Sequence, residues 1–435
     1  MSHAIERVVV INDDSVPSGG AAGIMLASIR QLRAREVPVT LLTGDDGANP
    51  ELADLGVDVV SLGGRHILEG GRVEAAMRGL YARKTAQLLQ AWIDAHDTPG
   101  TVYHLHNWHK VLSPAAFVPL RQVAARLVLS AHDYFLACPN GGYYHYPKGK
   151  ACELKPLGLG CVVSACDKRN YAHKLWRVAR GTLREMLFSF RNTPATVLAV
   201  HDGMIPLLER GGIGRQCIEV LRNPVTPWRS SRVAAEQNQT FLFVGRLEQD
   251  KGVTLLAQAA RRAKLPVRMI GTGPLAETLQ RGFPELQMTG WKSPKEIAQL
   301  CREARALVMP SRWRETFGLA ALEAAMSGLP VIASRATLIC EDLERLGIGI
   351  GCEADDLDAL AQAMTSLAHD DLAAARMSYR GVEHARSLAP TPGAWGEALV
   401  ALYRHKLSAS QTLPCAPNAT TGSEPHPAVP NSGNA

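Results

Sequence analysis

The residues of this chain best suited to chemistry are two acids and two cations in its second half. Glu315 and Glu323 are eight positions apart in SRWRETFGLAALEAAMSGLP, a stretch rich in Ala, Leu and Gly, and Arg246 and Lys251 lie in VGRLEQDKGVTLL. The cations can hold a phosphate, and the carboxylates can accept hydrogen bonds from hydroxyl groups on either side of it. An isolated pair of such acids is more often a dipole partner at a helix start and a helix-surface residue, so other motifs must decide.

A helix start next to these acids predicts an anion site. ALVMPS predicts a strand, and the following stretch predicts a helix that Thr316 caps and Gly328 ends. Free backbone N–H groups at Phe317, Gly318 and Leu319 would then face a ligand, with the partial positive charge of the helix behind them. Ligands of open parallel sheets bind outside the carboxyl ends of the strands, where this loop would lie.

Glycine turns follow two further strands of the same half. Gly245 comes directly after TFLFV, and Gly271 and Gly273 come after LPVRMI in the turn GTGP. Glycine allows close approach of backbone to ligand. GTGP lacks the third glycine of a dinucleotide fingerprint, so it means little alone. The three loops together predict a pocket for a pyrophosphate flanked by hydroxylated rings.

Parallel sheets must position these loops, because short β-branched runs alternate with helix-length segments. Strands are expected at 7–12, 37–44, 101–106, 125–133, 196–202, 240–245, 265–271, 306–311 and 329–334, with helices at 21–34 and 73–96 among others. The alternation predicts an α/β protein with two doubly wound domains. The expected organisation is an N-terminal domain at 1–222 with an insertion at 136–170, a C-terminal domain at 223–388, a final helix at 389–407 and a disordered tail at 408–435.

Composition limits the function further. The 435 residues are 46% hydrophobic and 20% charged, which is enough for a large core, and the net charge of +6 is too mild for a dedicated nucleic-acid binder. No apolar run reaches the roughly 18 residues that cross a bilayer, and the start MSHAIERVVVINDD has no signal-peptide core. Nine cysteines, an odd number, fit a reducing compartment. We therefore expect a cytoplasmic protein.

Taken in order, GRLEQDKG, GTGP, TGW, MPS and the paired glutamates resemble the retaining glycosyltransferases of family 4, which have the GT-B fold. The resemblance implies that Arg246 and Lys251 hold the diphosphate of a nucleotide sugar, that Glu315 contacts sugar hydroxyls and that Glu323 binds the ribose. It matches Phe317, Gly318 and Leu319 to the backbone that meets the phosphate and the donor sugar. Trp291 matches the base-binding edge and would stack there or pack in the core.

The resemblance extends to the first half of the chain. It places the loop ending at Gly19 and Gly20 over the donor phosphates, and His132 beside the reacting sugar. A lone His-Asp pair such as HD in LSAHDYF is otherwise more often a hydrogen bond at a strand end. His104 and His106 do not have the spacing of a metal site, and we interpret them as structural or acceptor-side residues. The final helix is expected to return to the N-terminal domain.

The implied reaction is transfer of a sugar from a nucleotide sugar to a glycan or lipid-linked saccharide, with retention, in surface polysaccharide assembly. No cofactor or divalent metal is expected, because two cations and a helix start can stabilise the leaving diphosphate. The one D-x-D, at Asp356 and Asp358, is assigned to helix capping. A GT-B sugar epimerase and an inactive nucleotide-sugar-binding scaffold are the alternatives, whereas a dehydrogenase would need G-x-G-x-x-G after its first strand.

Two stretches of the first half stay open to two interpretations. Residues 168–191 carry seven Lys or Arg against one acid, with Arg177, Arg180, Arg184 and Arg191 on one helical face and Tyr171, Leu175, Ala179, Leu183, Met186 and Phe190 on the other. This segment either docks on an anionic membrane at its inner face or packs its apolar face on the core and leaves the basic face in solvent. Cys138, Cys152, Cys161 and Cys166 either hold a structural zinc or are free thiols.

Overall fold

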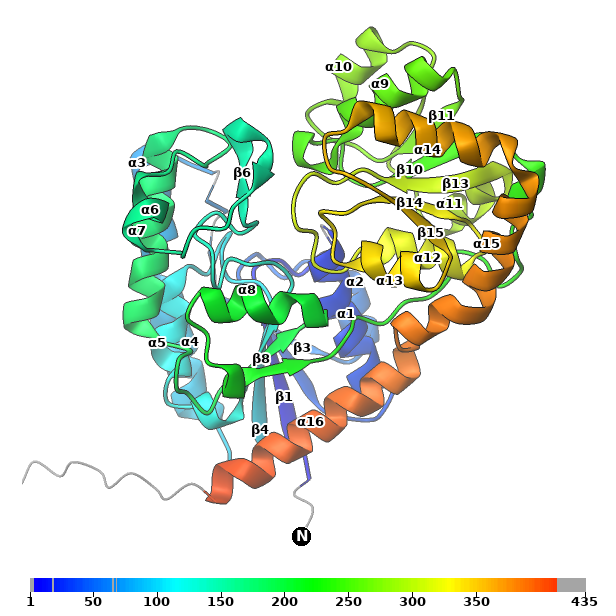
Figure 1. Cartoon of the computed structure of the whole chain (residues 1–435). Coiled ribbons are helices and arrows are strands. Elements are labelled where there is room, and N and C mark those ends of the chain that lie inside the picture. The colour runs from blue at the N-terminus through cyan, green and yellow to red at the C-terminus, as the bar shows by residue number, and fades with distance from the viewer. Residues whose placement is uncertain (1–3, 18, 65, 68, 413–435) are drawn as a thin grey trace, which may run out of the picture.

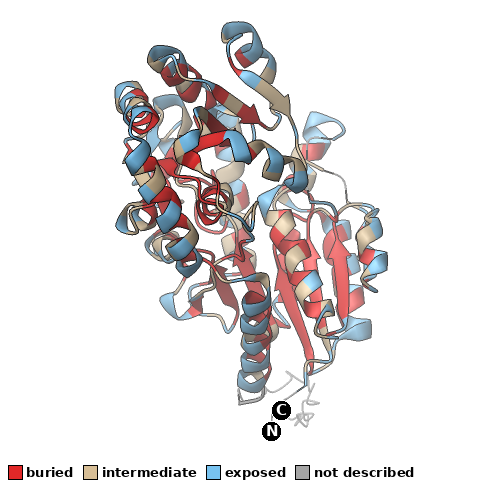
Figure 2. Ribbon diagram, turned by 90° about the vertical axis from the view of Figure 1, so that its right-hand side faces the viewer, coloured by how far each residue is buried: buried red, intermediate tan, exposed pale blue. Residues whose placement is uncertain are grey.

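The computed structural model describes residues 4–17, 19–64, 66–67 and 69–412, and it contains two α/β domains (Figure 1). The fold class expected from the alternation of strands and helices is confirmed. Both main sheets are entirely parallel. Helices therefore cover both faces of each sheet, and most strand residues are buried, as the red strands of Figure 2 show.

The N-terminal sheet has seven strands in the order β3-β2-β1-β4-β5-β8-β9. Their bounds are β1 Arg7–Asn12, β2 Val39–Thr43, β3 Asp58–Ser61, β4 Thr101–Leu105, β5 Leu127–Ala131, β8 Thr196–Ala199 and β9 Ile218–Val220. The order reverses at β1 and β4, so the loops that follow these two strands meet at the carboxyl edge of the sheet. The short strands β3 and β9 were missed in the sequence because they are brief edge strands.

The C-terminal sheet has six strands in the order β12-β11-β10-β13-β14-β15. Their bounds are β10 Thr240–Val244, β11 Val267–Ile270, β12 Gln287–Gly290, β13 Ala304–Met309, β14 Val331–Ser334 and β15 Gly349–Cys352. The strand order reverses between β10 and β13. The loops that follow these two strands, which contain GRLEQDKG and SRWRE, therefore lie side by side. The expected neighbours are thus in place, although β12 and β15 were not foreseen.

The helices fill the crossovers. In the N-terminal domain they are α1 Gly20–Arg33, α2 Pro50–Asp54, α3 Arg72–Leu80, α4 Arg83–His96, α5 Phe117–Leu120, α6 Leu159–Val163, α7 Tyr171–Leu187 and α8 Ile205–Arg210. In the C-terminal domain they are α9 Val253–Ala263, α10 Ala276–Gly282, α11 Pro294–Leu300, α12 Leu319–Met326, α13 Ile339–Arg345, α14 Leu357–His369 and α15 Asp371–His384. The single helix expected at 73–96 is broken, because the N–H of Ala82 donates to the Ser113 hydroxyl.

A last helix, α16 Pro392–Thr412, returns to the N-terminal domain (Figure 1). Its apolar residues Trp395, Leu399 and Tyr403 are buried in one cluster with β1, β2 and α1. The helix continues beyond the expected end at residue 407, so residues 408–412 are helical and not part of a disordered tail. The rest of the predicted tail, 413–435, lies outside the described residues.

The domains also meet directly beside the linker. Arg222 donates to Asp202 of the N-terminal domain at 3.0 Å and to Asp342 of α13 at 2.8 Å. His201 lies 3.2 Å from the same Asp342 carboxylate. Hydrogen bonds from His201, Arg345 and Arg222 hold the pKa of Asp342 well below its usual range despite burial. A charged network thus fixes the N-terminal domain to α13.

The insertion at 136–170 forms a small hairpin, β6 Tyr144–His145 with β7 Lys150–Ala151, and then α6. Its carboxylate Glu153 pairs with Arg210 of α8 at 2.7 Å and with Arg314 of the C-terminal domain. Lys168 approaches Glu248 of the C-terminal domain at 3.8 Å. The insertion therefore bridges the two domains.

The zinc hypothesis for the insertion is not supported. Within the described ranges no group of three or more His, Cys, Asp or Glu side chains is arranged to hold a metal ion, and all four cysteines of the insertion are free. The buried Lys174 ammonium donates to Cys161 Sγ at 3.1 Å. Burial by itself would lower the pKa of Lys174, but the hydrogen bond to Cys161 and the nearby Cys166 and Cys138 outweigh burial and raise it. A lysine ammonium thus lies against a thiol of this insertion.

Helix α7 is oriented opposite to the core-packed interpretation. Its cations Lys174, Arg180 and Arg184 are buried, whereas Tyr171, Leu175 and Met186 are 41%, 42% and 76% exposed. Arg180 Nη2 donates to the His109 carbonyl at 2.7 Å, and Arg184 Nη2 to the Leu136 carbonyl at 2.6 Å. Interior carbonyls therefore satisfy Arg180 and Arg184, whereas Tyr171, Leu175 and Met186 face solvent. Phe190 and Arg191 were assigned to the same two faces, but they lie beyond the end of α7, where Phe190 is buried and Arg191 is exposed. No described helix is both long and apolar enough to span a bilayer.

Candidate active site between the two domains

The loops after β10 and β13 bring Lys251 and Glu315 into contact. Lys251 Nζ lies 2.8 Å from Glu315 Oε1, and the Ser311 hydroxyl donates to Glu315 Oε2 at 2.6 Å. The ammonium also lies 5.4 Å from the ring centre of Trp313, a favourable cation–π distance. Sequence reasoning missed Ser311 and Trp313, although both lie within the same SRWRE motif as Glu315.

This ion pair keeps Glu315 charged. Burial by itself would raise the pKa of Glu315, but the Lys251 ammonium, the Ser311 hydrogen bond and the charge of Arg246 outweigh burial and lower it. A buried carboxylate of this kind stays ionised at neutral pH. Lys251 is thereby oriented beside the helix mouth.

Arg246 is the second predicted cation, and it is more exposed. Its guanidinium donates to Glu248 Oε1 at 2.6 Å, and its side chain is 58% exposed. Its charge contributes to the lowered pKa of Glu315, which places it on the same side of the sheet. The three predicted groups of the C-terminal domain therefore lie in one region.

The mouth of α12 begins one turn after Glu315. Gly318 is the N-cap, with φ +79° in the left-handed region, where a side chain would meet Ile339 and Met309. Within the part of the chain that the structure describes, the amides of Phe317, Gly318 and Leu319 donate no hydrogen bond. Free N–H groups at a helix start are the feature that the predicted anion site requires.

Thr316 does not cap this helix, contrary to the sequence-based expectation. Its hydroxyl instead donates to the carbonyl oxygen of His132 at 2.8 Å, across the two domains. Gly318 takes the cap position because the left-handed turn there starts the helix two residues later. The Thr316 bond joins the loop after β13 to the end of β5, where His132 follows.

Glu323 lies on α12, partly buried, away from any cation. The Trp228 indole donates to Glu323 Oε2 at 3.2 Å. Burial raises the pKa of Glu323 to about 7, with the indole hydrogen bond only partly opposing it. The two glutamates that the sequence pairs therefore differ in charge at neutral pH. Trp228 was not foreseen, since it lies in the linker 95 residues earlier.

The glycine turns pack their backbones against one another. A side chain at Gly271 would lie 1.9 Å from the carbonyl oxygen of Gly245, and one at Gly273 would lie 2.5 Å from that of Leu247. A pocket of about 500 Å³ opens beside the turn, lined by Gly271, Thr272, Gly290 and the start of α10. Trp291 is 71% exposed beside Gly290, so the alternative of a packed core tryptophan is wrong.

The loop after β1 lies over the α12 mouth. A side chain at Gly20 would be 3.5 Å from Leu319 Cδ1, whereas Gly19, the N-cap of α1, has open space around it. The buried carboxylate of Asp13 accepts from the amides of Val111 and Leu112, both at 2.9 Å. Asp13 therefore ties this loop to the loop after β4.

His132 is partly buried and lies against two buried histidines, His104 and His106. His132 Nε2 lies 2.9 Å from His106 Nδ1, and His104 bonds to the Tyr403 hydroxyl of α16 at 2.6 Å and to Ser130 at 2.9 Å. Burial lowers the pKa of His132 to about 4, so its imidazole is neutral at pH 7. His104 is structural, and His106 supports His132.

Asp133, the neighbour of His132, lies near a second group of residues. His109 Nε2 is 3.9 Å from Asp133 Oδ2, and Arg180 holds the His109 carbonyl. Burial raises the pKa of Asp133 to about 6, although the Phe135 amide donates to the carboxylate. His109 and Arg180 were quoted in the sequence, but their convergence on Asp133 is visible only in three dimensions.

The D-x-D motif is a helix cap. Asp356 is the N-cap of α14 and accepts from the Ala359 amide at 2.9 Å. Asp358 pairs with Arg262 of α9. The expected capping role of Asp356 is confirmed.

Comparison with known proteins identifies the second domain. Residues 225–384 match the family described as glycosyl transferases group 1. A glycogen synthase of Mycobacterium tuberculosis is 28% identical over 269 residues, an alignment that covers 57% of this chain and 62% of the synthase. The chain thus matches less than two thirds of that relative's length.

Solved structures show the same fold. A sucrose-phosphate synthase from Thermosynechococcus elongatus superposes with a TM-score of 0.66 at 18% identity, covering 93% of this chain and 100% of that one. HepE of Anabaena in complex with UDP-glucose superposes with a TM-score of 0.63 at 16% identity, covering 91% and 98%. The chain therefore carries a group 1 glycosyltransferase domain at residues 225–384 within the two-domain GT-B fold.

Proposed function

We propose that the protein transfers a sugar from a nucleoside diphosphate sugar, a UDP- or GDP-sugar, to a hydroxyl of a glycan or lipid-linked saccharide. The observation that carries the proposal is the Lys251–Glu315 pair at 2.8 Å beside the free amides of α12, joined to His132 by the Thr316 hydrogen bond. Cations, free amides and a neutral imidazole meet where a diphosphate and a sugar would lie. HepE, which has the same fold, binds UDP-glucose.

The leaving group takes the charge that these residues can stabilise. Breaking the sugar–phosphate bond adds negative charge to the diphosphate, which Lys251, Arg246 and the α12 amides would receive without rearrangement. Glu315 would hold Lys251 in place and accept bonds from sugar hydroxyls. We propose that this charge compensation needs no divalent metal, so that chelators leave turnover unchanged.

The acceptor hydroxyl would attack from the same face that the diphosphate leaves, and the configuration at the anomeric carbon would be retained. The attacking oxygen gives its proton to the departing phosphate. His132 would share a hydrogen bond with a sugar hydroxyl in this arrangement, and its ring would do so as a neutral imidazole. Determination of the product's anomeric configuration by NMR tests this step.

A thermal-shift panel of UDP, GDP and ADP and of their sugars tests donor binding. A ligand present at 100 times its Kd stabilises the folded state by about 2.7 kcal/mol. We expect one nucleotide and its sugar to raise Tm, and Lys251→Ala to remove most of that rise. If no nucleotide raises Tm, or if EDTA abolishes turnover, the proposal is wrong.

Work at a membrane would suit a lipid-linked acceptor in polysaccharide assembly. Helices α3, α6 and α7 expose Val73, Met77, Leu159, Val163 and Met186, with exposed fractions of 67–87%. We propose that this face rests peripherally on the anionic inner surface of the cytoplasmic membrane, with the apolar side chains entering the interface. Co-sedimentation with anionic vesicles tests this, and Leu159→Glu with Val163→Glu should abolish it. Retained binding in that variant would contradict the proposal.

A further inference from the structure

A second hollow lies in the N-terminal domain, outside the residues assigned to the donor. It has a volume of about 710 Å³, within the size range of small-molecule sites. It is lined by the loop before α3, by α3, and by the first turns of α7, with Ile67, Arg72, Ala76, Arg169, His173 and Trp176 among its residues. Its position was not foreseen in the sequence, because the two helices are almost 100 residues apart.

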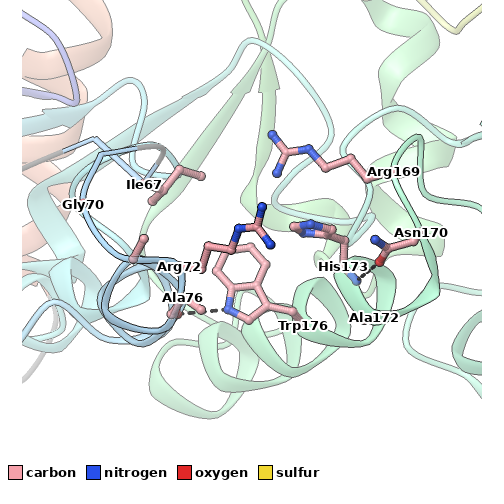
Figure 3. Close-up of a pocket in the computed structure, with 10 residues that line it drawn as sticks. Ile67, Gly70, Arg72, Ala76, Arg169, Asn170, Ala172, His173 and Trp176 are labelled. Carbon is pink, nitrogen blue, oxygen red and sulfur yellow. Dashed lines mark hydrogen bonds between the residues drawn. The ribbon is translucent and has the colours of Figure 1, made fainter.

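Three nitrogen-bearing side chains converge on this hollow. Figure 3 shows Arg72, Arg169 and His173 pointing toward one another above the indole of Trp176. In the described residues, neither the Arg72 nor the Arg169 guanidinium forms a hydrogen bond or an ion pair with a side chain. The nearest acid of α3, Glu74, pairs instead with Arg78 at 3.1 Å. Two guanidiniums therefore face each other without a counter-charge, an arrangement that an oxyanion would stabilise.

The start of α7 adds to this positive region. Asn170 caps the helix by accepting from the His173 amide at 3.0 Å, and the helix continues for 17 residues. The amides of Tyr171 and Ala172 donate no hydrogen bond among the described residues, and Ala172 lines the hollow. A long helix with free N–H groups at its start favours an anion there.

A series of contacts runs from the floor of the hollow to the candidate active site. Trp176 donates to the Ala76 carbonyl at 3.0 Å, which fixes the indole, and it lies 5.4 Å from the Arg180 guanidinium. Arg180 in turn holds the His109 carbonyl, and His109 lies beside Asp133. These contacts connect the hollow to Asp133, the residue next to His132.

We infer that this pocket, named here the α3/α7 pocket, binds a phosphate group of the acceptor, so that the preferred acceptor is phosphorylated. This inference rests on the proposed glycosyl transfer. Arg72 and Arg169 would bind the phosphate oxygens, His173 and the α7 amides would donate to it, and the saccharide would extend along Trp176 to His132. Bidentate arginine bonds fit phosphate better than a lysine does.

Isothermal titration of the full chain with inorganic pyrophosphate tests the pocket. We expect two classes of site, of which Lys251→Ala removes the donor class. Arg72→Gln and Arg169→Gln should each weaken the other class by about tenfold or more, the scale of a lost charge-assisted bond. Arg169→Lys should retain part of the affinity. Arg83→Gln, an exposed arginine of α4 outside the pocket, is the matched control and should change neither class.

Vesicles distinguish a membrane-borne phosphate from a soluble one. Phosphatidylcholine vesicles with and without phosphatidic acid are compared for the wild type, the Arg72→Gln/Arg169→Gln variant and the Arg83→Gln control. If phosphatidic acid strengthens vesicle binding by the wild type and the control but not by the pocket variant, the phosphate belongs to a lipid. If the pocket variant loses affinity for pyrophosphate but binds both kinds of vesicle as the wild type does, the phosphate belongs to a soluble acceptor.

The inference is overturned if the pocket variants match the wild type in both measurements. Failure of the proposed transfer is seen separately. In that case no nucleotide sugar raises Tm, whereas the pocket titration is unaffected. Conversely, a failed pocket leaves the nucleotide-dependent rise in Tm in place.

Discussion

The two sides of the candidate site hold their ionisable groups in opposite ways. The C-terminal side uses a charged pair, Lys251 and Glu315, in which the cation lowers the pKa of the acid. The N-terminal side uses buried imidazoles, and burial lowers the pKa of His132 to about 4. The difference suits the proposed reaction, in which one side would balance a diphosphate and the other would meet neutral hydroxyls. It also gives each side its own response to mutation and to pH.

The largest effect is expected on the charged side. Lys251→Ala should lower kcat/KM by about 10²–10³-fold, because it removes a preorganised cation from the leaving group. Steady-state kinetics with the identified donor measure this. Lys295→Ala, an exposed lysine on α11, is the control and should retain activity. A kcat/KM near the wild-type value in Lys251→Ala would show that the C-terminal side does not act through this cation.

The neutral side should respond less steeply. His132→Ala should reduce kcat by about 10–100-fold, within or below the range of one positioned hydrogen-bonding group. Because the pKa of His132 is about 4, its titration should change kcat only as the pH falls through 4. A pH–rate profile between 3.5 and about 8 checks this. An inflection near pH 6.5 that disappears in His132→Ala would show that the ring is not held neutral.

Glu323 tests whether all acids on the C-terminal side behave as Glu315 does. Its folded-state pKa of about 7 exceeds the ordinary value of 4.5, so the folded state holds the proton more tightly. The contribution of protonated Glu323 to the free energy of unfolding is therefore fully present below pH 4.5 and is lost as the pH rises through about 7. Glu323→Gln should avoid that loss and gain up to about 3 kcal/mol above pH 7. Denaturant unfolding across this range measures it, and equal pH slopes in both proteins would contradict it.

Thr316 links the two sides, and its loss should have a moderate effect. Thr316→Val removes the hydrogen bond to the His132 carbonyl at 2.8 Å, which we expect to cost about 1 kcal/mol. KM for the acceptor should rise more than KM for the donor, because the bond aligns the acceptor side with α12. Thr316→Ser is the control, since it keeps the hydroxyl. If Thr316→Ser raises KM as much as Thr316→Val does, the effect does not come from the hydroxyl hydrogen bond.

The smallest effect is expected at the insertion. Glu153→Gln weakens the pairs with Arg210 and Arg314, but Glu153 is 60% exposed, so the stability loss should be at most about 1 kcal/mol. The loss should shrink in high salt, because exposed charges are screened. Thermal unfolding at two ionic strengths measures it. A loss that is independent of salt would mean that packing, and not charge, holds the insertion.

The sequence by itself determined the alternation of strands and helices, and hence the two parallel sheets. It also indicated the candidate site of the C-terminal domain, because Arg246, Lys251 and Glu315 lie in the loops that follow β10 and β13. A residue that follows a parallel strand must lie at its carboxyl edge, whatever the rest of the chain does. The sequence also indicated Gly271 and Gly318 as turn positions. Both have positive φ values, which glycine adopts more easily than other residues.

Only the tertiary structure decided which face of α7 is buried, what Thr316 binds and what surrounds Lys174. Periodicity shows that α7 has two faces, but interior carbonyls such as that of Leu136 determine that the arginines turn inward. The same holds for the α3/α7 pocket, whose arginines come from distant segments. Burial and partners depend on contacts between remote parts of the chain, and local residue patterns carry no information about those contacts.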